Sequence, residues 1–327
     1  MPSERSNKLL EHIFLPNISD KVAEYKASRK KFVHYTSATA ALNMLETKVI
    51  WLRNTRHMND FSEIEHGIEH LREFFGDADR CLKIINTFNK FEVGILEKAV
   101  AKFNDVIETV HKNTYLASIS EHLSSEDRYG RLSMWRAYGG QDGSVAIVLN
   151  PGPFFEDSDA FQSYSIPALY HFKTDLKDEV EKLQSRFEDN IDVIQSKYSR
   201  ETICGYLVHF LLLTAIASKH PGFLEEKEWR VFHLPTITMS ERVTKTVENI
   251  RGNEETVYKI PLQDFPDENM QGIEIPRLID KIIIGPSGNP SQIKESIVAR
   301  LEAEGVAMAA EKVIVSTIPL RIKTYKR

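Results

Sequence analysis

The chain has 327 residues, enough for one large domain or two ordinary ones, and its 42% hydrophobic and 27% charged residues exclude wholesale disorder. Its net charge of −5 gives no overall attraction to polyanions, although a local basic surface could still hold nucleic acid. Cys81 and Cys204 are too few for a disulfide scaffold, and we find no export signal, so we expect a cytoplasmic protein.

Strand and helix patterns alternate along the chain, without a repeat or a flexible linker between them. In chain order, strands are predicted at residues 31–35, 49–52, 114–120, 143–149, 226–234, 257–260, 281–286 and 313–316. Helices are predicted at 38–45, 63–76, 80–111 (one long helix or a pair), 126–138, 175–219 and 291–304. The sequence therefore predicts an α+β fold.

This alternation continues through most of the chain. We expect a single domain at residues 31–327, preceded by an N-terminal helical arm at 1–30 and carrying helical insertions near 64–111 and 175–220. The most apolar run, 207–218, is about half the length that spans a bilayer and contains His209. It is therefore expected to be a buried core helix, and no membrane partner is expected.

His34, Tyr35, Thr36 and Ser37 form a dense group of hydrogen-bonding side chains at the end of the first strand, just before a helix. Anionic or polyhydroxylated ligands are often held at such a position. A helix cap explains Thr36 and Ser37 equally well, and an ordinary structural histidine explains His34.

Metal and nucleotide signatures are weak. Asn59 and Asp60, followed by Glu63, resemble a capped helix start. His66 and His70 lie one helical turn apart, but no third ligand is evident, so we expect no metal. Phosphate loops, dinucleotide fingerprints, nucleophile elbows and zinc helices are absent from the sequence.

Two further pairs have a functional and a structural interpretation. Ser118 and Ser120 point to the same side of their strand and could donate hydrogen bonds to a ligand, or simply face water. Trp135 and Tyr138 share one helix face by their spacing and could stack on a flat ring. Core packing is the ordinary alternative for Trp135.

The segment FLEEKEWRVF, at 223–232, is the most informative part of the chain. Strand alternation predicts Glu226, Glu228 and Arg230 on one face, with Trp229 on the other. Two carboxylates placed in this way can stabilise positive charge that develops on a sugar. The alternative is an exposed glutamate face paired with Arg230 and anchored by a buried Trp229.

Several segments together resemble an uncharacterised bacterial family classified only as a domain of unknown function, from about Phe32 to Ile318. They are VHYTS, WLRNTRHMNDFSE, YLASISE, SMWRAYGG with GSVAIVLN, EKEWRVF and IDKIIIGPS, with HYTS, NDxxE, MWxxYG and EKEWR as the main motifs. Their order is also remotely similar to the ADP-ribosyltransferase fold, including toxins of phage-defence and toxin–antitoxin systems. This second resemblance implies a central split β-sheet with numerous surrounding helices.

The ADP-ribosyltransferase resemblance also implies a site for NAD as co-substrate. It implies that Glu228 is catalytic and that Glu226 assists it or selects the acceptor. Because Glu225 leaves the register of the pair ambiguous, which of Glu226 and Glu228 is catalytic stays open. The implied NAD-binding residues are His34, Tyr35, Thr36, Asn59, Ser118, Ser120, Trp135 and Tyr138. The serine pair departs from the family pattern, since it reads Ser-Ile-Ser rather than Ser-Thr-Ser.

The expected function is therefore NAD-dependent mono-ADP-ribosylation of a macromolecule, whether RNA, DNA or protein, by a toxin or phage-defence effector. A neutralising antitoxin protein is a possible partner. Two alternatives remain open, namely an NAD glycohydrolase, in which water replaces the acceptor, and a non-catalytic protein-binding module on the same fold.

Overall fold

The computed structural model describes residues 7–28, 30–58, 63–138, 143–156, 158–170, 175–250 and 252–319, and only the backbone at positions 63 and 175. Asn59, one of the residues expected to bind NAD, lies outside these ranges. The described residues form a mixture of helices and one large mixed sheet, which confirms the α+β class.

The helices, as far as the described residues go, fall into an N-terminal pair, a central group and a C-terminal group. They are α1 (Lys8–Phe14), α2 (Pro16–Ser28), α3 (Ala38–Thr47), α4 (Glu63–Phe75), α5 (Ala78–Asn89), α6 (Ile95–Lys112), α7 (Leu132–Tyr138), α8 (Asp175–Asp189), α9 (Ile191–Lys197), α10 (Arg200–Ala217), α11 (Ile275–Leu278), α12 (Pro290–Ala303) and α13 (Ala309–Lys312). Short 3₁₀ helices are η1 (Thr55–His57), η2 (Ser124–Glu126), η3 (Gly152–Phe155), η4 (Pro221–Glu226) and η5 (Pro266–Glu268).

The strands occur along the whole length of the described chain. They are β1 (Lys31–Ser37), β2 (Val49–Asn54), β3 (Tyr115–His122), β4 (Ser144–Leu149), β5 (Ser163–Pro167), β6 (Leu169–Tyr170), β7 (Ser218–Lys219), β8 (Glu228–His233), β9 (Thr244–Ile250), β10 (Asn253–Pro261), β11 (Ile279–Ile284) and β12 (Val313–Val315). β6 and β7 form a small parallel pair of their own.

The large sheet is forked at β3. Its order is β12-β11-β4-β1-β3-β2-β10-β9, and β8 and β5 follow on the other edge of β3. On one edge of β3, β1 pairs with Ser120–His122 and β2 pairs with Tyr115 and Leu116. On the opposite edge, β8 pairs with β3 over Tyr115–Ser120. Strands β1 and β2 therefore separate beside the middle of β3.

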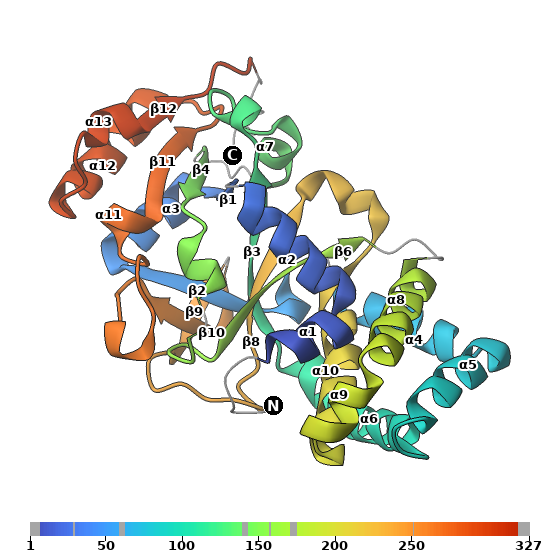
Figure 1. Ribbon diagram of the computed structural model, residues 1–327. Coiled ribbons are helices and arrows are strands. Elements are labelled where there is room, and N and C mark those ends of the chain that lie inside the picture. The colour runs from blue at the N-terminus through green and yellow to red at the C-terminus, as the bar shows by residue number, and fades with distance from the viewer. Residues whose placement is uncertain are drawn as a thin grey trace.

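Helices gather at two ends of the sheet (Figure 1). α10 packs against α4 and α6, and its buried side chains share one apolar core with residues of α5, α8 and α9. α10 alone among the described helices has the length and hydropathy of a membrane span, but 67% of it is buried inside the protein. That burial is typical of a core helix. The second core lies between the sheet and the helices α3 and α12.

Most predicted elements are present, with differences that have local causes. The predicted helical segment 80–111 is a pair, α5 and α6, because Gly94 takes a left-handed backbone (φ +80°) just before Ile95. The predicted helix at 126–138 begins only at Leu132, after a turn with Gly130 at φ +66°. Strands β5, β6, β7 and β9 were not predicted from the sequence, and β7 stands where the predicted helix 175–219 was expected to end. β9 is an edge strand whose side chains are mostly polar, so it lacks the apolar alternation of a core strand.

The described part of the predicted N-terminal arm, residues 7–28, is mostly helical and packs against the rest of the protein. Leu10, Ile13 and Phe14 of α1 are fully buried among side chains of the α10 core. Their burial stabilises α1 and α2 against α8, α10 and β5.

Candidate active site

A cavity of about 620 Å³ lies at the fork of the sheet. We call it the front cavity. Its walls come from β1, α3, β2, β3, α7, β7, η4, the first residue of β8 and the last residue of β9. It brings together eight of the residues predicted to form the site, His34, Tyr35, Thr36, Ser118, Ser120, Tyr138, Glu226 and Glu228.

Glu228 is held at the floor of this cavity by the strand next to it. The register of β3 and β8 places Ser120 opposite Glu228. The hydroxyl of Ser118 donates a hydrogen bond to Oε1 of Glu228 over 2.5 Å. The backbone N–H of Glu228 donates to the hydroxyl of Tyr170 over 2.7 Å. Glu228 is only 2% exposed, so the position of its carboxylate is set by these partners and by its cations.

Glu226 does not lie on the same strand as Glu228, which corrects the predicted strand alternation. It is the last residue of η4, and Lys227 has a left-handed backbone (φ +46°) that ends the 3₁₀ helix before β8 begins. The two carboxylates nevertheless converge, because the turn brings Glu226 back toward the start of β8. Tyr138 donates a long hydrogen bond of 3.4 Å to Oε1 of Glu226.

Lys219 joins the two glutamates, and sequence reasoning did not identify it. Its Nζ lies 2.7 Å from Oε2 of Glu226 and 2.6 Å from Oε2 of Glu228. The lysine is 3% exposed, and lysines are almost never buried unless they are paired. The available signal was its position at the end of the most apolar run of the chain, where a lysine needs a buried partner.

The charges around Glu228 decide its ionisation. Burial raises the pKa of its carboxyl, but the positive charges of Arg230 and Lys219, with hydrogen bonds from Lys219 and Ser118, outweigh burial and leave this pKa below its ordinary value. Arg230 is fully buried, and its guanidinium donates to the backbone carbonyls of Ile216 and Ser218. Glu228 is therefore an anion at neutral pH.

His34 is the β1 residue that follows the last β1–β3 pair, Val33 opposite Ser120. Its Nδ1 lies 3.0 Å from the backbone carbonyl of Ser118, so Nδ1 carries the proton. Burial lowers the pKa of this imidazole, against the opposing effect of that hydrogen bond. His34 is thus a neutral side chain whose Nε2 is left as an acceptor.

Trp135 lies in the core, outside the front cavity. Its ring is 2% exposed and makes an edge contact with Tyr35, with ring centroids 4.9 Å apart. A Cβ built on Gly130 or on Gly285 would lie less than 3 Å from the indole, so both positions need glycine. Trp135 therefore supports the cavity wall through Tyr35, whose hydroxyl accepts a hydrogen bond from the backbone N–H of Arg131.

The start of α3 forms another part of the wall. Thr36, Ser37 and Ala40 line the front cavity. The side chain of Ser37 caps the helix by accepting a hydrogen bond from the N–H of Ala40, which confirms the predicted cap. Thr36 does not cap the helix, and it lines the cavity just before the helix begins.

The structure adds a third histidine near the pair that the sequence suggested. The rings of His66 and His70 are 4.2 Å apart, and the ring of His220 is 5.6 Å from that of His66. Even so, the described part of the chain contains no group of three histidine, cysteine or acidic side chains arranged to hold a metal ion.

Comparison with known proteins covers part of this site. Residues 134–231 match the family described as "Protein of unknown function (DUF2971)". The resemblance to a domain of unknown function is thereby confirmed for under a third of the chain, from α7 to β8. This stretch contains Lys219, Glu226 and Glu228, whereas His34 and Ser118 lie outside it. No curated protein and no solved structure matches the chain.

Proposed function

We propose that the protein is an NAD-dependent mono-ADP-ribosyltransferase that acts on a macromolecule. The observation that carries this proposal is an ionised Glu228 that accepts a hydrogen bond from Ser118 at the fork of a split sheet, with Glu226 beside it. The forked sheet and the surrounding helices support an ADP-ribosyltransferase-like fold for this chain.

The chemistry explains why an anion at this position is useful. Loss of nicotinamide from NAD leaves positive charge on the ribose, and a fixed carboxylate stabilises that charge more in the transition state than in the ground state. Ser118 and Lys219 hold Glu228 in one orientation, so little reorganisation is needed at the moment of reaction. Glu226, which is less buried, is placed to orient the incoming acceptor.

The rest of the front cavity supports a dinucleotide. Its volume of about 620 Å³ falls within the ~300–1,000 Å³ range of small-molecule sites. The dipole of α3 adds partial positive charge at the helix N-terminus, beside this cavity, which favours a phosphate there. We assign His34, Tyr35 and Thr36 to the adenosine side, and Ser118, Ser120 and Tyr138 to the nicotinamide–ribose side.

The acceptor side is assigned to η4. Phe223 and Leu224 are 38% and 53% exposed, and they lie in η4, the same short helix as Glu226. Exposed apolar side chains beside a reactive group are typical of a contact surface for a second molecule. In this proposal the target is RNA, DNA or protein, the protein acts in the cytoplasm as a toxin or phage-defence effector, and an antitoxin protein neutralises it.

Incubation with labelled NAD and separate pools of cell protein, RNA and DNA tests the proposal. We expect label on one pool, reduced about 10³-fold in Glu228→Gln, because the variant keeps the shape but loses the charge. Circular dichroism and thermal unfolding check that the variant is folded. Release of free ADP-ribose without labelled macromolecule would identify NAD hydrolysis instead of transfer.

A specific observation favours a rival function. The Glu228 carboxylate contacts Ser118, Lys219 and Arg230, and its side chain is buried, as in a purely structural ion-pair network. If native protein neither binds NAD nor releases nicotinamide, the fold is a non-catalytic protein-binding module, and the exposed η4 surface is the place to look for its partner.

A further inference from the structure

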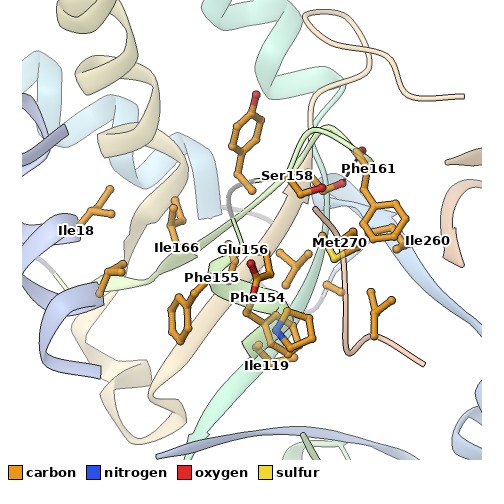
Figure 2. Close-up of a pocket in the computed structure, with 18 of the residues that line it drawn as sticks. Ile18, Ile119, Phe154, Phe155, Glu156, Ser158, Phe161, Ile166, Ile260 and Met270 are labelled. Carbon is orange, nitrogen blue, oxygen red and sulfur yellow. Dashed lines mark hydrogen bonds between the residues drawn. The ribbon is translucent and has the colours of Figure 1, made fainter. Parts of the chain in front are cut away.

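A second space lies on the opposite face of the sheet from Glu228, and Figure 2 shows part of its lining. We call it the reverse-face cleft. It has a volume of about 680 Å³, also in the ~300–1,000 Å³ range of small-molecule sites. Strand alternation explains why it differs from the front cavity. Ser118 and Ser120 line the front cavity, whereas Ile119 between them lines only the cleft.

The body of the cleft is elongated and apolar. Figure 2 shows Ile18 toward one end and Ile260 toward the other. The apolar side chains labelled between them are Ile166, Phe155, Phe154, Ile119, Met270 and Phe161. Protein interiors are packed as densely as organic crystals, so a space of this size and lining suits an apolar occupant. Its shape fits one extended hydrocarbon chain.

The charged side chains that line the cleft do not favour an anionic head group. Lys8 and Lys26 are cationic there, and Glu11, Glu156 and Asp159 are anionic. With three acidic groups against two basic ones, a carboxylate or phosphate gains no net attraction from these residues.

The polar groups of the lining are suited to an uncharged partner. Burial lowers the pKa of His209 from 6.5 to about 4, and burial also lowers the pKa of His34. Both imidazoles are therefore neutral at pH 7. The hydroxyl oxygen of Ser165 is buried with no hydrogen-bond partner among the described residues. Neutral imidazoles and a hydroxyl can hydrogen-bond an alcohol without the cost of burying a charge.

We propose that the reverse-face cleft binds an uncharged single-chain amphiphile, namely a long-chain or isoprenoid alcohol. The chain lies along the apolar wall, and the hydroxyl bonds to one of the neutral polar groups. His34, Met44 and Ile50 line both the cleft and the front cavity, so the occupant touches the wall of the candidate active site. This inference does not depend on the proposed transferase activity.

Fluorescence of N-phenyl-1-naphthylamine, a neutral apolar probe, tests the proposal on the full chain. We expect the probe to bind native protein and to be displaced by 1-hexadecanol at a concentration at least tenfold lower than by palmitate. Two variants fill the cleft from different elements of its lining, Val22→Trp on α2 and Ser165→Phe on β5. Each is expected to weaken probe binding at least tenfold, whereas Ser196→Phe, at an exposed position of α9, leaves binding unchanged.

Thermal unfolding first identifies which of the two variants is folded, and either one alone suffices. The proposal is overturned if native protein does not bind the probe, or if a folded cleft variant binds it as tightly as native protein. Equal or stronger displacement by palmitate overturns the assignment of an uncharged head group.

Discussion

The front cavity and the reverse-face cleft have similar volumes, about 620 and about 680 Å³, and they share the same strand, yet their chemistry is different. Lys219, Glu226 and Glu228 make the front cavity a charged, hydrogen-bonded site. The body of the cleft is apolar, and His209 in its lining is neutral. Ser118 and Ile119 are neighbours on β3, but strand alternation points their side chains toward these two different environments. The network of buried charges, and not the volume, therefore distinguishes the candidate active site.

The largest expected effect comes from breaking the charge network of the front cavity with Lys219→Met. Removing the shared cation leaves two carboxylates close together, and that of Glu228 is almost fully buried. Breaking a buried ion pair by removing one partner typically costs about 3–5 kcal/mol. We expect a loss of that size in the free energy of unfolding, measured by urea denaturation.

The matched control for this change is Lys197→Met, at an exposed position of α9. It is expected to change stability by less than about 0.5 kcal/mol. A loss in Lys219→Met as small as that of the control would mean that the two glutamates do not need the cation.

Acid should affect the two regions in different pH windows. His209 in the reverse-face cleft has its pKa lowered to about 4, so the unfolded chain binds a proton more readily than the folded one. Its contribution to stability is therefore complete above pH 6.5 and is lost as pH falls toward 4, by about 3 kcal/mol in total. The pKa of Glu228 is also lowered. The contribution of Glu228 to the free energy of unfolding is therefore lost only as pH falls below the ordinary glutamate pKa of about 4.3.

Urea unfolding of native protein and of His209→Gln between pH 7 and pH 4 separates these contributions. The variant is expected to lose less stability than native protein between pH 7 and pH 4. Below pH 4, both proteins are expected to lose stability. Parallel curves for the two proteins would show that His209 titrates normally and is accessible to water.

Support for the front cavity wall can be tested at Gly130. An alanine there has φ near +66° and a Cβ 2.2 Å from the Trp135 ring, so strain and overpacking together should cost about 3 kcal/mol. Gly94→Ala is the matched control, because φ is +80° and nothing lies within 4 Å of the new Cβ. It should cost about 1 kcal/mol. Equal losses of stability in the two variants, measured by thermal unfolding, would contradict the role of Trp135 as a rigid support of Tyr35.

Local patterns predicted much of this fold. β1, β3, β4 and β11 have apolar or alternating sequences that identify a strand without its partners. The fork of the sheet could not be derived from such patterns, because it depends on which strands pair, and β9 is too polar to be recognised.

The candidate site was only partly predictable for the same reason. Ser118 and Glu228 could be placed on strands that face one site, and the structure brings them into contact. Lys219 is 9 residues from Glu228 and follows an apolar helix, so no spacing rule connects it to the glutamates. Trp135 and Tyr138 share a predicted helix face, yet only Tyr138 lines the front cavity, because Trp135 packs between the backbones of Gly130 and Gly285.

The finest test of the comparison uses two neighbouring residues of β3. Ser118→Ala removes a hydrogen bond to an ionised carboxylate and should cost about 2 kcal/mol in stability. If Glu228 is catalytic, the same loss of positioning should lower kcat about 30-fold. Ile119→Val removes one methyl group from the reverse face and should cost about 1 kcal/mol with kcat unchanged. Urea denaturation measures the stability of the two variants, and single-turnover transfer from labelled NAD measures their rates. An equal fall of kcat in the two variants would mean that the two faces of β3 act as one unit.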